Sequence, residues 1–447
     1  MPATFFQRAE RRRGMTAESV GVLGLVALLA LLFLRVPVAV AMGVVGVAGM
    51  TALLGAGAGM NVLRTAPWTS VASYDYAVIP LFMLMGNICF HSGISEELFR
   101  MLHRWVGHFR GGLALAAVGA CAGFAALSGT TLATAVTMGA VALPEMKKHG
   151  YDPALSTGVV AAGGTLGVLI PPSTVLVIYG MLTEQNIAVL FMAGVIPGLL
   201  QALFYAVTVA VVCRVKPDAG PASVPFSWKE RLASLKGCWT VLVLFGLVMG
   251  GICRGWFSPS EAAAVGAAGA LLLALLRRRL SWRAFGMSLM DAVKSTAMIM
   301  VVMVGAMLLG YFFSVTRIPF TLASEVSALN VSPVMIMVML VAMYVLLGCV
   351  MIPVAMVVLT MPIVFPLITS LGYDPVWFGI IVVRIFEIAQ ITPPVGLNVF
   401  VIKSVAHDVP LTTIFRGVSW FLVADVLHLA LLFAFPALSL WLPSRMN

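Results

Sequence analysis

Charged side chains are scarce in this chain. Only 10% of its 447 residues are Asp, Glu, Lys or Arg, whereas a soluble domain carries roughly 25%. Apolar residues make up 61%, and the mean hydropathy is +1.06. A soluble protein is therefore excluded. Apolar runs of membrane-spanning length recur along the chain, which predicts an all-α polytopic membrane protein.

Motifs for catalysis and metal binding are also missing. The sequence has no HExxH, no GxSxG and no phosphate-binding loop, so no machinery for an intramembrane enzyme is visible. Its six cysteines are scattered, without a CxxC pair or a Cys/His cluster, which indicates neither disulfides nor a metal site. We expect them to be packing residues, and we expect a protein that is not an enzyme and needs no cofactor.

The formal charge is +10, but the basic residues lie in short runs between apolar segments, as in cytoplasmic loops of membrane proteins. Nucleic-acid binding is therefore not expected. Four arginines precede the first apolar run: Arg8, Arg11, Arg12 and Arg13. The run is long and has no A-x-A cleavage site, so it predicts a retained first span rather than a signal peptide.

An internal repeat organises the chain. Gly150-Tyr151-Asp152-Pro153 recurs as Gly372-Tyr373-Asp374-Pro375, and Pro171-Pro172 recurs as Pro393-Pro394 at the same offset. In each copy the double proline interrupts an apolar helix in its middle. A repeat of this length decides the fold, so the domain organisation is predicted from it.

The first repeat is expected over residues 1–214. Its predicted elements are spans at 18–34, 36–54 and 77–93, an interfacial arm helix at 94–110, a re-entrant hairpin at 111–144, a broken helix at 153–183 and a span at 187–213. A hairpin is favoured over one kinked span because Ser128-Gly129-Thr130-Thr131 divides the apolar run into two arms of about fifteen residues, too short to cross.

A polar segment, 215–236, is expected to be a cytoplasmic linker. The second repeat, 237–447, follows the same order, with spans at 237–255, 259–276 and 288–313, an arm helix at 317–330, a hairpin at 333–366 that breaks near Gly348 to Pro353, a broken helix at 375–405 and a span at 415–442. Each repeat thus has about five spans, one re-entrant hairpin and one discontinuous helix.

An odd number of spans per repeat predicts two inverted-topology repeats. Charge agrees, because the loop before the first broken helix contains Lys147 and Lys148, whereas its counterpart, 367–373, has no Lys or Arg. The positive-inside rule makes only the first loop cytoplasmic. The count places both termini outside, which the N-terminal arginines do not fit; either an early span is miscounted or the chain begins at Met15.

Inverted repeats with discontinuous helices are typical of secondary transporters, whose binding site lies at mid-membrane. Proline lacks an N–H, so the carbonyls about one turn before each double proline lose their helical partners, near Gly167 and Val168 in one repeat and Ala389 and Gln390 in the other. Freed carbonyls suit a hard cation. The half-helix after each break offers N–H groups to an anion.

Polar residues accompany both breaks. The first hairpin tip should approach the first broken helix, where Gly163, Gly164 and Gly167 leave room. In the second repeat the polar atoms come from Thr392, Gly396 and Asn398. A single hydroxyl in such a place often bonds back to its own helix. Neutral oxygens dominate at both breaks, which favours Na⁺ over H⁺ as the coupling ion.

Few charged residues lie within the apolar segments near these breaks. Glu387 lies three residues after Arg384, so the two side chains can form an ion pair on one helix. The alternative is that Arg384 binds an anionic substrate. Asp425 and His428 are expected to form a structural pair in the last span.

Four stretches carry a resemblance to a known family: IPLFMLMGNI (79–88), LSGTTLATAVTMGAVALP (127–144), GTLGVLIPPS (164–173) and ITPPVGLNVFVIK (391–403). They resemble the large membrane subunit of tripartite ATP-independent periplasmic (TRAP) transporters. The resemblance implies an elevator-type transporter of the bacterial inner membrane that uses Na⁺ to import small organic acids, such as dicarboxylates or sugar acids. It also implies two partners, a small four-helix membrane subunit and a periplasmic substrate-binding protein.

The resemblance further implies two sodium sites, with the substrate between the two hairpin tips. One would use Ser128, Gly129, Thr130, Gly164, Gly167 and Pro171; the other would use Gly348, Met351, Thr392, Pro393 and Gly396; the substrate would contact Thr131, Ser173, Arg384, Pro394 and Asn398. Many members have Asp where this chain has Ile352. Since isoleucine has no side-chain ligand, this departure implies a smaller part for the second tip in binding.

Other functions stay open at this stage. A standalone Na⁺-coupled anion symporter or antiporter of the same superfamily would work without a secreted binding protein. A membrane scaffold or receptor would show no Na⁺-dependent uptake and would tolerate Thr392→Ala. A channel is a weaker alternative, because it needs no alternating access.

Overall fold

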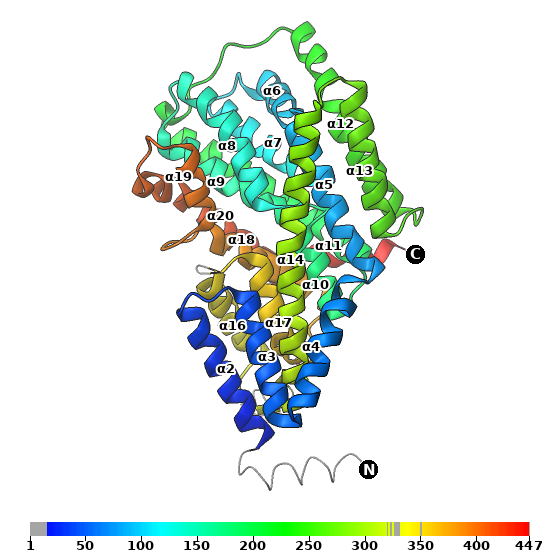
Figure 1. Ribbon diagram of the computed structural model, residues 1–447. Coiled ribbons are helices and arrows are strands. Elements are labelled where there is room, and N and C mark those ends of the chain that lie inside the picture. Colours follow the sequence, from blue (N-terminus) through cyan, green and yellow to red (C-terminus); the bar gives the residue numbers. More distant parts are fainter. Residues whose placement is uncertain (1–15, 320, 322–323, 326–330, 349–350, 447) are drawn as a thin grey trace. The chain divides into compact units, whose positions relative to one another are not determined.

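The structure is a computed structural model that describes residues 16–319, 321, 324–325, 331–348 and 351–446. Every regular element within these ranges is a helix (Figure 1), as the composition predicts. The chain divides into two compact units built from separate stretches of sequence. Unit 1 takes the residues up to Tyr76, Lys294–Met339 and Pro353–Pro375, and unit 2 takes Ala77–Val293, Leu340–Ile352 and Val376 onward. Each unit thus draws on both predicted repeats.

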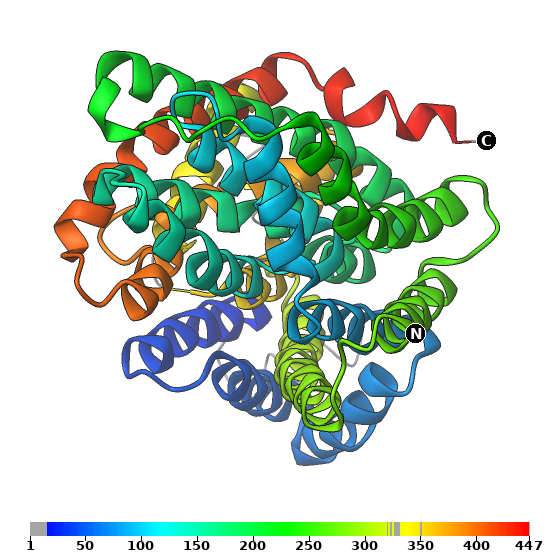
Figure 2. The same cartoon turned by 90° about the horizontal axis from the view of Figure 1, so that it is seen from above.

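Unit 1 is assembled around closely packed small residues. It contains α2 (Ala17–Phe33), α3 (Val38–Leu54), α4 (Ala56–Val71), the later part of α14 (Trp282–Thr316), the first part of α16 (Pro333–Gly348) and α17 (Pro353–Ser370). Helices α2 and α3 lie side by side in both views (Figures 1 and 2). A Cβ atom on Gly46 of α3 would lie 2.5 Å from the carbonyl oxygen of Leu308 in α14, so these two backbones approach closely only because residue 46 is glycine.

Unit 2 holds most of the predicted site. Its helices are the ends of α14 and α16 that unit 1 does not take, α5 (Val78–His91), α6 (Ile94–Val106), α7 (Gly112–Ser128), α8 (Thr131–Lys148), α9 (Pro153–Leu169), α10 (Thr174–Thr183), α11 (Ile187–Val215), α12 (Trp228–Cys253), α13 (Pro259–Leu276), α18 (Pro375–Ile391), α19 (Leu397–Val405), α20 (Leu411–Ala434) and α21 (Ala437–Leu440). Short 3₁₀ turns occur at Tyr74–Ala77, Pro217–Ala219 and Pro443–Arg445.

The repeated Gly-Tyr-Asp-Pro motif forms the turn that precedes each broken helix. Gly150 and Gly372 have φ values of +72° and +79°, a conformation that favours glycine. Asp152 then caps α9, because its Oδ1 accepts a hydrogen bond from the N–H of Ala154 at 2.6 Å. Pro153 follows at the first helical position, where its missing N–H costs nothing.

Helix α9 is the buried centre of unit 2. Every residue from Ala154 to Leu169 is buried, and α7, α8, α11 and α20 pack around it. The crossing with α20 is so close that a Cβ atom on Gly417 would lie 1.8 Å from the carbonyl oxygen of Ala154. This packing holds the C-terminal end of α9, where the double proline lies, in a fixed place within the unit.

The helix boundaries differ from the predicted ones in several places, and α14 for example begins at Trp282 instead of residue 288. Helix α4 lies in a stretch to which the sequence assigned no element. The predicted linker 215–236 is shorter, because α11 continues to Val215 and α12 already begins at Trp228. The last span begins at Leu411 and ends at Ala434. Most of the predicted arm helix 317–330, like the arginine-rich segment before residue 16, lies outside the described residues.

With α9 and α10 counted together as one, seven helical segments in the described ranges are long and apolar enough to cross a membrane, or eight if the bent pair formed by α4 and α5 is one span. The sequence predicted about ten spans. Part of the difference is length, since α2 and α3 have 17 residues each, slightly under the ~20 that a perpendicular span needs. The inverted orientation of the two repeats stays a prediction.

Candidate sodium and substrate site

The first hairpin tip lies against the first helix break. Helix α7 ends at Ser128 and α8 begins at Thr131, with Gly129 between them at a φ of +61°. The carbonyl oxygen of Gly129 accepts a hydrogen bond from the N–H of Thr174, the first residue of α10, at 3.3 Å. A Cβ atom on Gly129 would lie 2.6 Å from the carbonyl oxygen of Pro172. The tip and the break are therefore in direct contact.

Two glycines of α9 admit the tip, at the places that the sequence predicted. A Cβ atom on Gly167 would lie 2.3 Å from the carbonyl oxygen of Thr130. One on Gly164 would lie 2.7 Å from the Cβ of Ala135 in α8. The third predicted glycine, Gly163, faces α7 instead, since its Cβ would lie 2.8 Å from Cys121 Sγ.

A residue that the sequence analysis did not name joins the oxygens of the tip. Thr134 Oγ1 lies 2.9 Å from Ser128 Oγ and donates to the carbonyl oxygen of Thr130 at 2.8 Å. Ser128, Thr131 and Thr134 are each at most 4% exposed. Thr134 by itself gave no signal in the sequence, and only its spacing of four residues from Thr130, the N-cap of α8, hinted at the contact.

The break itself spans the residues between α9 and α10. The last α-helical bond joins the N–H of Ile170 to the carbonyl of Leu166, and the bond between Pro171 and Pro172 is cis. Neither proline can donate to the carbonyls of Gly167 and Val168. Ser173 caps α10, its Oγ accepting from the N–H of Leu176 at 3.3 Å.

At the second break, fewer contacts between polar atoms are seen among the described residues than at the first. Helix α18 ends at Ile391 and α19 begins at Leu397, and the Pro393-Pro394 bond is cis. Thr392 Oγ1 donates to the carbonyl of Ile388, one turn back, at 2.6 Å. Gly396, which precedes α19, has a φ of +53°. Thr392 thus bonds back to its own helix, which is the alternative that the sequence left open for a single hydroxyl group.

Asn398, a predicted substrate residue, ties α19 to α9. It is 0% exposed, and its Nδ2 donates to the carbonyl of Ala161 at 3.2 Å. Gly348 and Met351 of the second tip are both buried. Residues 349–350 between them lie outside the described residues, so the second sodium site stays a prediction.

Arg384 is fully buried in unit 2, and the carboxylates that it binds lie in neither break. Its guanidinium donates to Glu387 and, at 2.9 Å, to Asp425 Oδ1 of α20, and all three side chains are 0% exposed. This arrangement favours the structural pairing with Glu387 over contact with a substrate. The predicted Asp425–His428 pair is wrong, because Asp425 bonds to Arg384 and neither ring nitrogen of His428 has a hydrogen-bond partner among the described residues.

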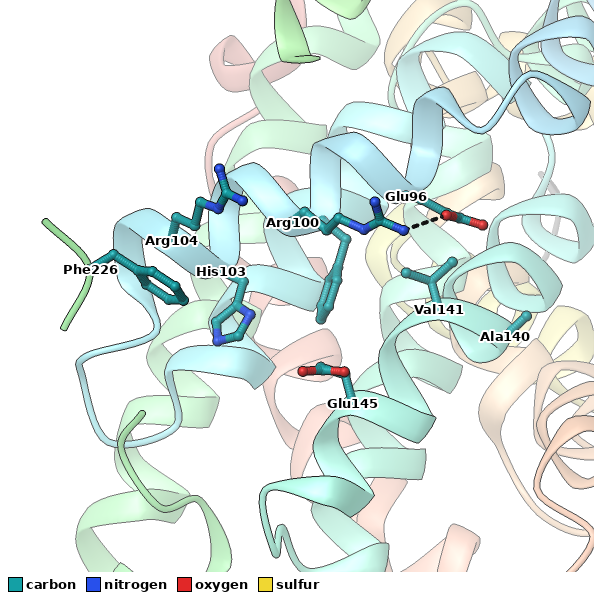
Figure 3. Close-up of a pocket in the computed structure, with 9 residues that line it drawn as sticks. Glu96, Arg100, His103, Arg104, Ala140, Val141, Glu145 and Phe226 are labelled. Carbon is teal, nitrogen blue, oxygen red and sulfur yellow. Dashed lines mark hydrogen bonds and ion pairs between the residues drawn. The ribbon is translucent and has the colours of Figure 1, made fainter. Parts of the chain in front are cut away.

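A separate cavity of about 450 Å³ opens beside the arm helix α6 (Figure 3). Its lining side chains come from α6, α8 and the segment before α12, and carry both signs of charge: Glu96, Phe99, Arg100, His103, Arg104, Ala140, Val141, Glu145 and Phe226. Arg100 donates to Glu96 at 2.9 Å. The cavity shares no lining residue with the first tip or break, so the two sites are distinct.

The helix termini at the first tip have opposite polarity. Helices α7 and α9 end there with carbonyl groups, the negative ends of their dipoles, at Ser128 and Leu169. Helices α8 and α10 begin there with N–H groups, the positive ends, at Thr131 and Thr174. The same small region can therefore stabilise both a cation and an anion.

Two of the known proteins that resemble this chain are large permease proteins of TRAP transporters. A C4-dicarboxylate TRAP transporter large permease protein of Pseudomonas aeruginosa is 40% identical over 83% of this chain and 86% of its own length. The large permease protein of a sialic acid TRAP transporter from Vibrio cholerae is 31% identical over 93% of this chain and 96% of its own length.

Among solved structures, the YdaH transporter of Alcanivorax borkumensis shares the fold, with a TM-score of 0.62 and 16% identity over 86% of this chain and 88% of that one. Residues 25–438 match the family described as the tripartite ATP-independent periplasmic transporter, DctM component. The chain therefore belongs to the DctM family of TRAP transporter large permease subunits, which are multi-pass transporters and not enzymes.

Proposed function

We propose that this large permease subunit imports a small organic acid, coupled to Na⁺, across the bacterial inner membrane. In this proposal a small four-helix membrane subunit completes the membrane complex, and a periplasmic substrate-binding protein delivers the substrate. The elevator-type movement implied by the family resemblance belongs to the same proposal.

The observation that carries the sodium coupling is the oxygen cluster at the first tip. Thr134 Oγ1 lies within hydrogen-bonding distance of both Ser128 Oγ and the carbonyl oxygen of Thr130. All three are neutral oxygens, the type of ligand that a hard cation takes. Proton coupling at this place would need a group that titrates, and neither Ser nor Thr does.

The class of substrate is supported by the relatives and by the helix termini. The two relatives above are named for C4-dicarboxylates and for sialic acid, which are both organic acids. The N-termini of α8 and α10 meet at the tip through the bond between Gly129 and Thr174, and they would attract a carboxylate. A C4-dicarboxylate is the first candidate, since the relative named for it has 40% identity.

Uptake by proteoliposomes tests this function. The chain, its small subunit and the binding protein are reconstituted, and radiolabelled organic acids are supplied with an inward Na⁺ gradient or with K⁺ in its place. We expect uptake with the Na⁺ gradient and none with K⁺. We also expect uptake only when the binding protein is present. Uptake that is unchanged without a sodium gradient would refute the coupling, and uptake without the binding protein would favour a standalone symporter.

Two substitutions test one residue of the first tip and one residue of the second break. Ser128→Ala and Thr392→Ala are expected to raise the Na⁺ concentration for half-maximal uptake by about tenfold, if each loses about 1.4 kcal/mol of sodium binding. The matched control is Ser156→Ala, because Ser156 is about as buried and its hydroxyl bonds within the first turn of α9, donating to the carbonyl of Asp152 at 2.9 Å. Unchanged sodium dependence in both variants would remove these residues from the site.

A further inference from the structure

A cluster of ionisable side chains lies in the core of unit 2, apart from the first tip. Arg384 and Glu387 come from α18 and Asp425 comes from α20, and each side chain is 0% exposed. One amino group of the guanidinium binds Glu387 and the other binds Asp425 Oδ1 at 2.9 Å. We call these three residues the buried triad.

The charges of the buried triad do not balance. Within the part of the chain that the structure describes, the salt bridges of both carboxylates go to Arg384 alone. Two ionised carboxylates and one guanidinium would leave one excess negative charge in the core. An uncompensated charge in such a place is strongly unfavourable, and proteins usually avoid it by taking up or releasing a proton.

Each carboxylate also retains an oxygen that could carry a proton. Glu387 Oε1 and Asp425 Oδ2 are buried and have no hydrogen-bond partner among the described residues, and the same holds for the amide oxygen of Gln201 in α11. Gln201 and Tyr205, one turn apart on α11, lie beside Glu387 and Asp425 respectively. Gln201 Nε2 donates to the Tyr205 hydroxyl at 3.0 Å, so these two side chains are joined along one side of the triad.

We propose that the buried triad binds one proton, held on Glu387, so that Glu387 is a neutral carboxylic acid while Asp425 remains the ionised partner of Arg384. The proton is taken from water as the chain folds and is carried by Glu387 Oε1, the oxygen of Glu387 that has no hydrogen-bond partner among the described residues. The triad is then electrically neutral and ties α18 to α20 without a charge penalty. This inference does not depend on sodium coupling.

No other described group around the triad supplies a balancing positive charge. Tyr205 on α11 and His428 on α20 interact with residues of the triad. Two further tyrosines contact other residues of α18, Tyr179 on α10 at Gly379 and Tyr344 on α16, whose ring lies 5.8 Å from that of Phe386. Tyrosines are neutral at pH 7. His428 has no carboxylate partner in the described residues to hold a second proton.

Infrared spectroscopy of the purified full chain tests the proposal, in buffer at about pH 8 with K⁺ as the only alkali cation. Carboxyl groups in contact with water are ionised at that pH. We expect the wild-type protein to keep a protonated-carboxyl C=O band that shifts in D₂O and disappears in Glu387→Gln. Because the wild-type band is diagnostic by itself, the test survives a variant that does not fold. A wild-type spectrum without this band overturns the proposal.

Thermal unfolding gives the second readout. Glu387→Gln mimics the protonated side chain, so its melting temperature should stay within about 2 °C of the wild type and should no longer fall as the pH is raised. The double variant Glu387→Gln/Asp425→Asn leaves Arg384 unpaired and should melt far lower. The matched control is Glu97→Gln, whose carboxylate binds Arg277 at 2.7 Å and is 16% exposed, and which should keep the infrared band.

The same measurements show whether a proton or a sodium ion balances the charge of the triad. If Na⁺ balanced the triad, the band would be missing and Glu387→Gln would abolish a Na⁺-dependent rise in the wild-type melting temperature. That result, or an increase in stability when Glu387→Gln removes an excess charge, would overturn the proposal.

Discussion

Gly167 shows how tightly single residues determine the first tip. Because Gly167 has no side chain, the carbonyl oxygen of Thr130 can approach its backbone closely. A Cβ atom at position 167 would lie only 2.3 Å from that oxygen. Because the obstructing atom belongs to the backbone, it cannot move aside as the end of a flexible side chain can. The position therefore needs glycine for packing, since α8 and α9 must touch for the tip oxygens to converge.

We predict that Gly167→Ala destabilises the protein by about 1–3 kcal/mol, the usual cost of overpacking, and abolishes Na⁺-dependent uptake. The matched control is Gly246→Ala in α12, where an added Cβ would meet nothing within 4 Å and alanine favours the helix by up to about 1 kcal/mol. Thermal unfolding and uptake are measured for both. Equal behaviour of the two variants would show that the tip does not need this contact.

Residue-level prediction from sequence was uneven for a physical reason. Ser128 and Gly167 could be found because a break in an apolar run and a run of glycines both mark a close approach. Arg384 could not be placed, because its second partner, Asp425, is far away in sequence and only the packing of α18 on α20 brings them together. Thr134 was overlooked because one threonine inside a helix carries no signal by itself.

At the scale of elements, the breaks were the most predictable feature. Two consecutive prolines remove two donors, so α9 and α18 had to end close to Pro171 and Pro393. Helix α4 was not predictable in the same way. Its sequence contains Asn61, Arg64 and Pro67, which weaken the apolar signal, and its contact with α3 cannot be read from the sequence.

The packing of α6 against α8 should depend on pH. Burial lowers the pKa of His103, and His149 and Arg104 lower it further, while Glu145 opposes them. The unfolded chain thus takes up this proton at a higher pH than the folded chain. The stability that His103 contributes is therefore present above the unfolded pKa of about 6.5 and is lost as the pH falls below it.

We accordingly predict that the melting temperature falls between about pH 7.5 and pH 5.5, and that His103→Gln reduces this fall. His407→Gln is the control, since His407 is exposed and should leave the pH dependence unchanged. If His103→Gln and the wild type lose stability equally on acidification, the buried imidazole is not responsible.

At the scale of the whole molecule, the inverted repeats are the prediction with the widest consequences. The loop with Lys147 and Lys148 should be cytoplasmic, and the equivalent loop before α18 should face the other side. Lys148 and Ser370 are both exposed, so each can be replaced by cysteine in a background without the six native cysteines.

A membrane-impermeant maleimide applied to intact cells is expected to label Ser370→Cys and to leave Lys148→Cys unlabelled until the membrane is opened. The control is labelling of both variants after solubilisation. Labelling of both from the same side would mean that the halves run the same way through the membrane.

The sodium site at the first tip is the claim on which the transport mechanism depends, and ligand-induced stabilisation of the purified chain tests it most directly. A ligand that binds only the folded form stabilises it by about 2.7 kcal/mol at a hundred times its Kd. We predict a saturable rise in melting temperature with Na⁺ but not with K⁺, a rise that Ser128→Ala reduces and Ser156→Ala retains. Equal melting temperatures in Na⁺ and K⁺ would contradict the account.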